Sequence, residues 1–494
     1  MSDLKIVVLW TDALVFLLLA GTLAFGFYIR RKEHLIAPWR RLAQSRAGMA
    51  ALVVLALLLG IGLVDSLHFR PLVSGGGNGS EKSYAVEVLS LLDVLLAPLR
   101  ERKEKTYSAP LAAHLFAKET IELTDGRQMR EYPRLLHGGA HLRDPATERI
   151  PDIGMRAARG LAYGGGLWLL ANVLVTLTLA RRRRTTFSTM HRDVWRGVTG
   201  IPWNVILITV GVLLLVAGPV FSLAAEYHVL GTDKVGQDVL YLSLKSIRTA
   251  LVIGTLTTLV TLPLALLLGI MAGYFGGRTD DVIQYLYTTL NSIPGVLLIA
   301  AAVLTTQVYM DTHADMFETV SHRADFRLLF LCIILGMTSW TGLCRLLRGE
   351  ALKLREMDYI QAAQAFGVRR LRIITRHILP NVMHIVLIAI VMDFSGLVLA
   401  EAVLSYVGVG VDPSMISFGT MINGARLEMA REPMVWWSLA AAFVFMFLLV
   451  LAANLFADAV RDAFDPRVRV RARVTIDDTE GTPRPAPAVE GAMR

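Results

Sequence analysis

Charged residues are scarce in this chain, and cysteine is almost absent. Asp, Glu, Lys and Arg make up 18% of its 494 residues, and hydrophobic residues make up 54%. Because soluble domains carry about 25% charged residues, this composition predicts a polytopic membrane protein. The two cysteines, Cys332 and Cys344, fall in one predicted helix, where a rise of about 1.5 Å per residue keeps them roughly 18 Å apart. They cannot form a disulfide bond with each other in that geometry, so they give no indication of redox chemistry.

Common sequence motifs of catalysis and nucleotide binding are also missing. The chain has no Gly-x-x-x-x-Gly-Lys-Ser/Thr phosphate loop, no His-Glu-x-x-His zinc pair and no Gly-x-Ser-x-Gly nucleophile turn. His114, His137 and His141 belong to a long polar segment, but they lack the spacing of a metal site. We therefore expect a chain that is not an enzyme and that binds no metal.

The basic residues follow the apolar segments. The net charge is +9, and basic clusters at residues 30–46, 181–196 and 345–376 adjoin apolar stretches instead of forming a patch with interleaved aromatic residues. Basic residues beside membrane spans lie preferentially in the cytosol. We therefore expect an external N-terminus, a cytosolic C-terminus and no nucleic-acid partner.

Nine apolar stretches are candidates for membrane spans, which predicts an all-α polytopic membrane protein with about nine transmembrane helices. They are residues 6–28, 48–64, 160–180, 203–224, 250–274, 283–308, 328–343, 383–408 and 435–457. The first stretch could instead be a cleaved signal peptide, but its basic residues follow the apolar run and do not precede it. A retained helix is the favoured interpretation.

Two polar segments lie outside these spans. Residues 66–158 contain a glycine-rich, linker-like stretch at 75–80 and an apolar stretch at 86–99 that could lie on the membrane face. We expect this extracytoplasmic insertion to be an accessory module that can be removed without loss of assembly. Residues 468–494 are rich in Pro, Arg and Asp, which predicts a disordered cytosolic tail.

A charged hairpin at residues 350–381 separates two apolar spans, so it must protrude from the membrane. Asp358 is expected to cap a short helix, and Gly367 to close that helix in a left-handed turn. A break is expected at Leu379 and Pro380, before the chain re-enters the membrane. Small residues on the helix would let another protein's surface approach closely; the alternative is an ordinary hairpin that packs on its own protein.

This hairpin resembles the coupling loop of ABC-importer permeases, whose pattern is Glu-Ala-Ala, a glycine and Ile-x-Leu-Pro. Here the pattern reads Gln361-Ala362-Ala363, Gly367 and His377-Ile378-Leu379-Pro380. Glutamine replaces the usual glutamate, and histidine the usual isoleucine, although Arg-His-Ile-Leu-Pro-Asn is the wording of the peptide-importer branch.

Four further motifs, in the matching order, resemble the C-type inner-membrane subunit of dipeptide, oligopeptide and nickel importers. They are the external Gly231-Thr232-Asp233-x-x-Gly236-x-Asp238 run and residues 272–278, 404–411 and 454–467. The resemblance implies a six-helix permease core at 201–467, preceded by two helices in 1–65, the 66–158 insertion and a third helix with a basic linker in 159–200. Trp39 and Trp195 both begin sequences that look like the start of such a core, so an insertion after that start and a partial duplication both remain open.

The resemblance also implies a function and partners. It implies import of di- or oligopeptides across the bacterial inner membrane, with a second permease, two ATP-binding subunits and an external solute-binding protein. Nickel chelates and peptide antibiotics are alternative substrates, and an intramembrane channel or enzyme is an alternative class. ATP would be bound by the partner subunits, so no cofactor is expected on this chain.

The resemblance and the chemistry of the spans together select candidate functional residues. The expected ATPase-coupling residues are Asp358, Tyr359, Gln361, Ala362, Ala363, Gly367, Leu379 and Pro380. The possible pathway residues are Asn291, Pro294, Asp393 and Glu401. Ionisable groups within spans are often functional, but Asp393 could equally make a polar contact with a neighbouring helix.

Overall fold

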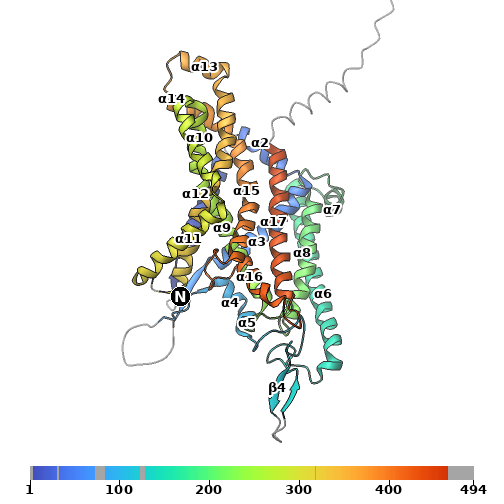
Figure 1. Ribbon diagram of the computed structural model, residues 1–494. Helices are drawn as coiled ribbons and strands as arrows, with labels where there is room; N and C mark the ends of the chain where they lie inside the picture. The colour runs from blue at the N-terminus through green and yellow to red at the C-terminus, as the bar shows by residue number, and fades with distance from the viewer. Residues whose placement is uncertain (1–3, 31–32, 73–83, 123–127, 318, 465–494) are drawn as a thin grey trace, which may run out of the picture.

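Long helices dominate the computed structural model, which describes the chain except for residues 1–3, 31–32, 73–83, 123–127, 318 and 465–494 (Figure 1). Nine helices in the described part are long and apolar enough to cross a membrane. They are α1 (Trp10–Ile29), α3 (Arg46–Asp65), α6 (Pro145–Arg183), α8 (Trp203–Ala224), α9 (Val239–Phe275), α11 (Gly295–Thr312), α12 (Val320–Arg355), α15 (Leu379–Val407) and α17 (Trp437–Phe464). The predicted all-α polytopic fold is confirmed.

The predicted cytosolic and external segments lie at opposite ends of the molecule. In Figure 1 the hairpin helix α13 (Asp358–Ala365) is at the top, and the strand β4 (Glu119–Glu122) of the polar insertion is at the bottom. The predicted 75–80 linker and 468–494 tail lie outside the described residues.

Six helices pack into one bundle around α9, and α3 is one of them. α9 packs along α12 and also contacts α15, α3 and α17, while α11 packs on α12. Leu58 of α3 belongs to the same buried cluster as Val239 of α9 and Leu449 of α17. A Cβ on Gly48 would lie 2.7 Å from the Cβ of Ala459 in α17, so α3 and α17 are in close contact.

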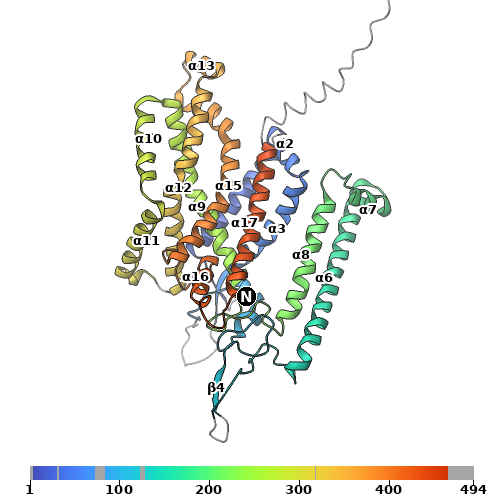
Figure 2. The ribbon, with the colours of Figure 1, turned by 45° about the vertical axis from the view of Figure 1, so that its right-hand side comes forward.

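Helix α8, the first helix of the predicted 201–467 core, is peripheral to this bundle. α8 packs mainly against α6 and contacts the bundle mainly through α3. Figure 2 shows α6 and α8 side by side, apart from the other long helices. Small residues explain the pairing: a Cβ on Gly160 of α6 would lie 2.5 Å from the carbonyl oxygen of Gly218 in α8, so the two backbones can touch.

Short amphipathic helices precede both α3 and α8 at the cytosolic end. They are α2 (Glu33–Leu42) and α7 (Phe187–Arg196). Trp39 of α2 packs edge-on against Phe464 of α17, with ring centroids 5.5 Å apart. Met190 and Val194 of α7 are buried against Leu207 of α8. The two Trp-Arg sequences therefore belong to similar local structures, but only the first adjoins the bundle.

Several spans begin at different residues from those predicted, and two of these shifts have a clear local cause. Leu4–Val7 form the strand β1, which pairs antiparallel with β2 (His68–Pro71), so the first span begins at Trp10 and not at residue 6. Helix α6 begins at Pro145 instead of residue 160, because the side chain of Asp144 accepts the amide of Ala146 and proline is favourable in the first turn.

The polar insertion is packed onto the bundle and is not a detached module; its removal without loss of assembly stays a prediction. Its described part contains β3 (Leu89–Ser90), α4 (Leu91–Leu95), α5 (Ala97–Glu101) and the hairpin of β4 with β5 (Gln128–Glu131). Leu99 and Tyr107 are buried in the same cluster as residues of α9 and α17. Removing the insertion would expose this apolar surface to water, which is unfavourable.

Candidate functional site

The hairpin at 350–381, which is predicted to be cytosolic, extends beyond the long helices as a compact unit (Figure 1). α13 is joined by Gly367 to α14 (Arg370–Ile373) and a π-helical turn (Ile374–Ile378) that leads into α15. Ile360 of α13 and Ile373 are both fully buried in the cluster that also contains Ala351 of α12. The hairpin is therefore fixed to the ends of the two helices that carry it.

Gly367 provides the reversal that the sequence predicted. Its φ is +72°, in the left-handed region that favours glycine. The amide of Gly367 donates to the carbonyl oxygen of Gln364, and the amide of Val368 to that of Ala363, as in a helix that ends at a left-handed residue.

Two local predictions for the hairpin are wrong. Asp358 does not cap α13: the capping position is Met357, in extended conformation, and Asp358 lies in the first turn, where its charge suits the helix dipole. Leu379 and Pro380 do not break the chain, because a π-helical turn continues directly into α15 with Pro380 in its first turn. Proline is tolerated there, since the widened turn does not require its missing amide.

The predicted coupling residues form a largely exposed surface. Tyr359 is 45% exposed, Gln361 and Ala362 are exposed, and Ala363 is half-buried. Gln361 Nε2 donates to the carbonyl oxygen of Glu356 (3.3 Å), so its side chain stabilises the start of α13.

Sequence reasoning missed two apolar side chains on the same surface. Phe366 is 87% exposed and Leu371 is 73% exposed. The pattern that could have identified them in the sequence is a large apolar residue on each side of Gly367. Exposed apolar side chains around small residues are typical of a protein-binding surface.

A partly buried ion pair braces the end of α12 near the hairpin. Arg348 donates to both carboxylate oxygens of Asp280 in α10 (Gly277–Ser292), at 2.5 and 2.6 Å. The hydrogen bonds from Arg348 hold the pKa of Asp280 below its usual range despite partial burial. This bidentate geometry fixes the angle between α10 and α12.

A cavity of about 840 Å³, the inner cavity, lies among α9, α11, α12 and α15, and Asp393 lines it together with Thr258, Thr261 and Thr338. In the part of the chain that the structure describes, no hydrogen bond or ion pair is recorded for the Asp393 carboxylate. The geometry therefore favours the cavity-lining alternative over a contact between helices.

The other predicted pathway residues have structural positions. Glu401 is buried and accepts hydrogen bonds from Ser405 (2.7 Å) and Ser417 (2.9 Å), which joins α15 to the start of α16 (Phe418–Glu428). Glu401 therefore has a structural role in this position, and its predicted pathway role stays a prediction. Asn291 Oδ1 accepts a hydrogen bond from Thr341 Oγ1 (3.1 Å), and Pro294 lies between α10 and α11, so the predicted 283–308 span is two helices.

The external motif forms a tight loop against the insertion. The hydroxyl of Thr232 accepts the amide of Ser108 (2.7 Å) and donates to the carbonyl oxygen of Thr106 (2.9 Å). Asp233 accepts the amides of Val235 and Gln237, at 3.0 and 2.8 Å. The loop residues predicted from the sequence therefore hold the loop together and bind it to residues 104–108.

Glycines allow this close contact. Gly231 and Gly236 both have positive φ, and a Cβ on Gly236 would lie 1.8 Å from the carbonyl oxygen of Glu104. Asp238 caps α9 by accepting the amides of Leu240 and Tyr241. These contacts give the motif a structural explanation that includes the insertion.

A buried histidine joins the motif to the insertion. His228 Nδ1 is 2.8 Å from Asp238 Oδ2, and Nε2 is 3.4 Å from Glu104 Oε1. Burial favours the neutral imidazole, but hydrogen bonds to Asp238 and Glu104 raise the pKa of His228 to about 9.

Glu104 also accepts hydrogen bonds from three backbone amides, those of Leu136, His137 and Gly138. Burial opposes its ionisation, yet these bonds and His228 lower the pKa of Glu104 to about 2.

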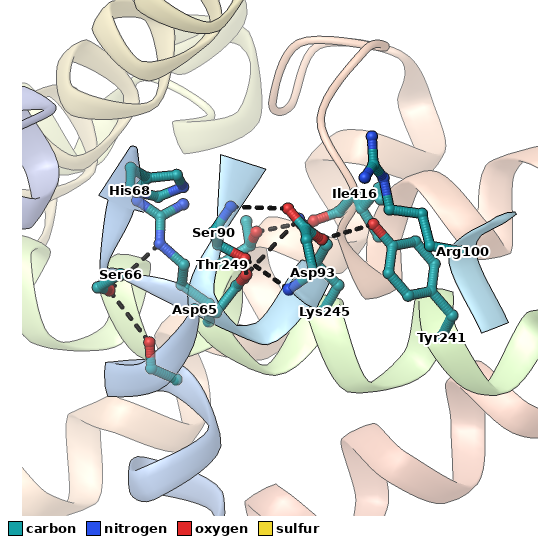
Figure 3. Close-up of polar contacts among 12 residues, drawn as sticks. Asp65, Ser66, His68, Ser90, Asp93, Arg100, Tyr241, Lys245, Thr249 and Ile416 are labelled. Atoms are coloured by element: carbon teal, nitrogen blue, oxygen red, sulfur yellow. Dashed lines mark hydrogen bonds and ion pairs between the residues drawn. The ribbon is translucent and has the colours of Figure 1, made fainter. Parts of the chain in front are cut away.

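A second polar cluster lies at the external ends of α3 and α9 (Figure 3). Lys245 of α9 forms an ion pair with Asp93 of the insertion and lies 3.6 Å from Asp65 of α3. Tyr241 donates to Asp93 (2.7 Å), and Ser90 Oγ donates to Asp65 (2.6 Å). Burial opposes ionisation of Asp93, but Lys245 lowers its pKa. This cluster was not predicted, because its residues are distant in sequence.

Metal binding has no support in the described residues. Within that part of the chain, no group of three His, Cys, Asp or Glu side chains has a geometry that could hold a metal ion.

Comparison with known proteins identifies the family. The family profile described as "Binding-protein-dependent transport system inner membrane component" matches residues 265–470. The oligopeptide transport system permease protein OppC of Mycobacterium tuberculosis is 31% identical over 242 residues, which are 49% of this chain and 77% of that protein.

Two further relatives have similar coverage. The dipeptide permease DppC of Bacillus subtilis is 27% identical over 242 residues, 49% of this chain and 69% of that protein. The glutathione permease GsiD of Pectobacterium atrosepticum is 32% identical over 244 residues, 49% of this chain and 73% of that protein. These relatives are named as transport permeases and not as enzymes, and with the nine apolar helices they indicate a multi-pass transporter of the bacterial inner membrane. The chain belongs to the dipeptide and oligopeptide permease family of ABC transporters.

Proposed function

We propose that the chain forms half of the translocation pathway of a peptide importer and is driven by separate ATPases that bind its cytosolic hairpin. The observation that carries this proposal is the position of α13, which protrudes from the bundle, presents Ala362 and Phe366, and is fixed beneath by the buried Ile360. A fixed, exposed helix can transmit a rigid-body displacement to the helices that carry it.

The proposed partners are those of an importer built from two permeases. The inner cavity is bounded by one bundle, and the proposed pathway would lie between this bundle and that of a second, homologous permease. Two ATP-binding subunits would dock on the hairpins, and a solute-binding protein would deliver substrate from outside. The names of the similar permeases specify oligopeptides, dipeptides and glutathione, all of which are peptides, so a small peptide is the favoured substrate over a nickel chelate.

The permease core is best assigned to α3, α9, α11, α12, α15 and α17. This assignment retains a six-helix core with three additional helices, α1, α6 and α8. The packing of α3 against α9 and α17 supports this assignment. This assignment favours an insertion between the first and second core helices over a partial duplication. Helices α6, α7 and α8 would be part of that insertion.

The test is peptide uptake together with ATPase co-purification. A deletion strain that carries Ala362→Glu should lose both uptake of labelled alanyl-alanine and co-purification of the ATPases, because a charged side chain would prevent close approach to an exposed small residue. Ser188→Glu adds the same charge to an exposed position of α7 and should leave both unchanged. Equal behaviour of the two variants would contradict the proposed docking surface.

A further inference from the structure

The external polar cluster borders a cavity, the outer cavity, that has no role in the function described so far. Its volume is about 640 Å³, and its walls come from the end of α3, the insertion, the first turns of α9 and the start of α12. A volume of this size lies within the range of about 300–1,000 Å³ that is typical of small-molecule sites.

The deep part of the outer cavity has more negative than positive groups. The side chains of Asp65 and Asp93 are 2% and 4% exposed, and they share the single ammonium group of Lys245 as their ion-pair partner. Their other partners are neutral donors: Ser90 for Asp65 and Tyr241 for Asp93. The neighbouring Arg248 is committed to Asp12, with Nη2 2.5 Å from Oδ1. Figure 3 shows Lys245 between the two carboxylates. A buried charge without a full partner is unfavourable, so this region favours an added cationic group.

The mouth of the cavity carries charges of both signs. Arg100 and Lys103 of the insertion line it together with Glu87 and Glu101, and Lys103 is exposed. Arg100 pairs with Glu87, whose side chain is 70% exposed; a surface pair of this kind exchanges readily with another carboxylate. An apolar strip that includes Leu9, Ala324 and Met415 completes the lining.

We propose that the outer cavity binds a small zwitterionic peptide before translocation, with its ammonium group toward Asp65 and its carboxylate toward Arg100 and Lys103. This inference rests on the proposed peptide function, and it adds a specific site to it. The insertion and α3 supply both charged ends, so the insertion has a direct role in recognition. Peptides that lack either terminal charge should bind weakly.

The test uses the purified full-length chain in lipid nanodiscs and calorimetric titration with alanyl-alanine. We expect binding of the free dipeptide, and at least about tenfold weaker binding of both N-acetyl-alanyl-alanine and alanyl-alanine amide, since each loses a charge-assisted contact. Arg100→Gln with Lys103→Gln should weaken binding of the free dipeptide but leave binding of the amide unchanged. These residues are at the mouth, so the fold should be retained.

The matched control is Lys105→Gln. Lys105 is a neighbouring cation of the insertion, 68% exposed and paired with Glu119 instead of facing the cavity. Lys105→Gln should leave the affinities for the free, acetylated and amidated dipeptides unchanged. Equal affinity for the free, acetylated and amidated peptides would overturn the proposal.

Uptake by the complete importer separates this proposal from the proposed function. Normal uptake of alanyl-alanine without binding to the purified chain would contradict the proposed outer site but would agree with the importer function. Charge-dependent binding without uptake would leave the site in place and contradict the importer function.

Discussion

Glu104 of the insertion and His228 of the external loop lie 3.4 Å apart although 124 residues separate them in sequence. Both side chains are buried, and each has a pKa shifted toward its charged form. This pair holds the insertion against the first turn of α9.

The histidine contact should make the attachment of the insertion dependent on pH. The pKa of His228 is raised from 6.5 to about 9, so its contribution is fully present below pH 6.5 and is lost as the pH rises through about 9. The pKa of Glu104 is lowered from 4.5 to about 2, so its contribution is present above pH 4.5 and is lost on acidification. We expect amide hydrogen exchange at residues 104–108, corrected for its intrinsic rate, to be slower at pH 6 than at pH 9.5.

The His228→Gln variant provides the control for this experiment. Glutamine is polar but does not titrate between these two pH values. The difference in amide exchange between them should therefore largely disappear. A wild-type exchange pattern independent of pH would exclude His228 as the source of the attachment.

The Gly48→Leu variant tests the assignment of α3 to the core. A side chain there must displace Ala459 of α17, and overpacking of this kind typically costs about 1–3 kcal/mol. Gly165→Leu in α6 is the matched control, because nothing lies within 4 Å of its Cβ position. We expect a lower thermal midpoint for Gly48→Leu alone; equal midpoints would contradict the packing of α3 on α17.

Phe366 should contribute to ATPase binding and not to the stability of this chain. Its side chain is 87% exposed, so Phe366→Ala should change the free energy of unfolding by less than about 0.5 kcal/mol. Co-purification of the ATPases should fall severalfold, since a buried aromatic residue at an interface is often a major contributor to binding. Phe187→Ala, at an exposed aromatic residue of α7, should leave co-purification unchanged. The opposite ranking would place the docking surface elsewhere.

Asp393 should influence transport without influencing assembly. Asp393→Asn retains the size of the side chain but removes a charge from the inner cavity. We expect normal co-purification of the ATPases and a change of severalfold in uptake rate or in preference between charged and neutral dipeptides. Uptake indistinguishable from wild type for both peptide classes would exclude Asp393 from the pathway.

The structural features that depend on local chemistry could be predicted from sequence patterns. Long apolar runs gave nine spans, and Gly367 was correctly assigned a left-handed turn. The cap of α13 was wrong because Asp358 and Met357 are both compatible with a helix start, and only the backbone conformation decides between them. The continuation through Pro380 was missed because a π-helical turn has no sequence signal that we could identify.

Long-range packing could not be predicted in the same way. α3 and α8 are both apolar helices that follow a Trp-Arg sequence, and only their contacts show which one joins the bundle. Glu401 looked like a pathway residue because ionisable groups in spans are often functional, but its two serine partners come from different elements. Asp65, Asp93 and Lys245 form one cluster only because the insertion folds back onto α9.

The coupling role of the hairpin is tested most directly by Gly367→Val, with ATPase co-purification and alanyl-alanine uptake measured in the same strain. The φ of +72° at this position is unfavourable for a β-branched residue, by at least about 1–2 kcal/mol, so the angle of α13 should change while the membrane helices remain intact. We predict normal membrane insertion, reduced co-purification and loss of uptake. Normal co-purification and normal uptake in this variant would contradict the proposal that α13 couples the permease to its ATPases.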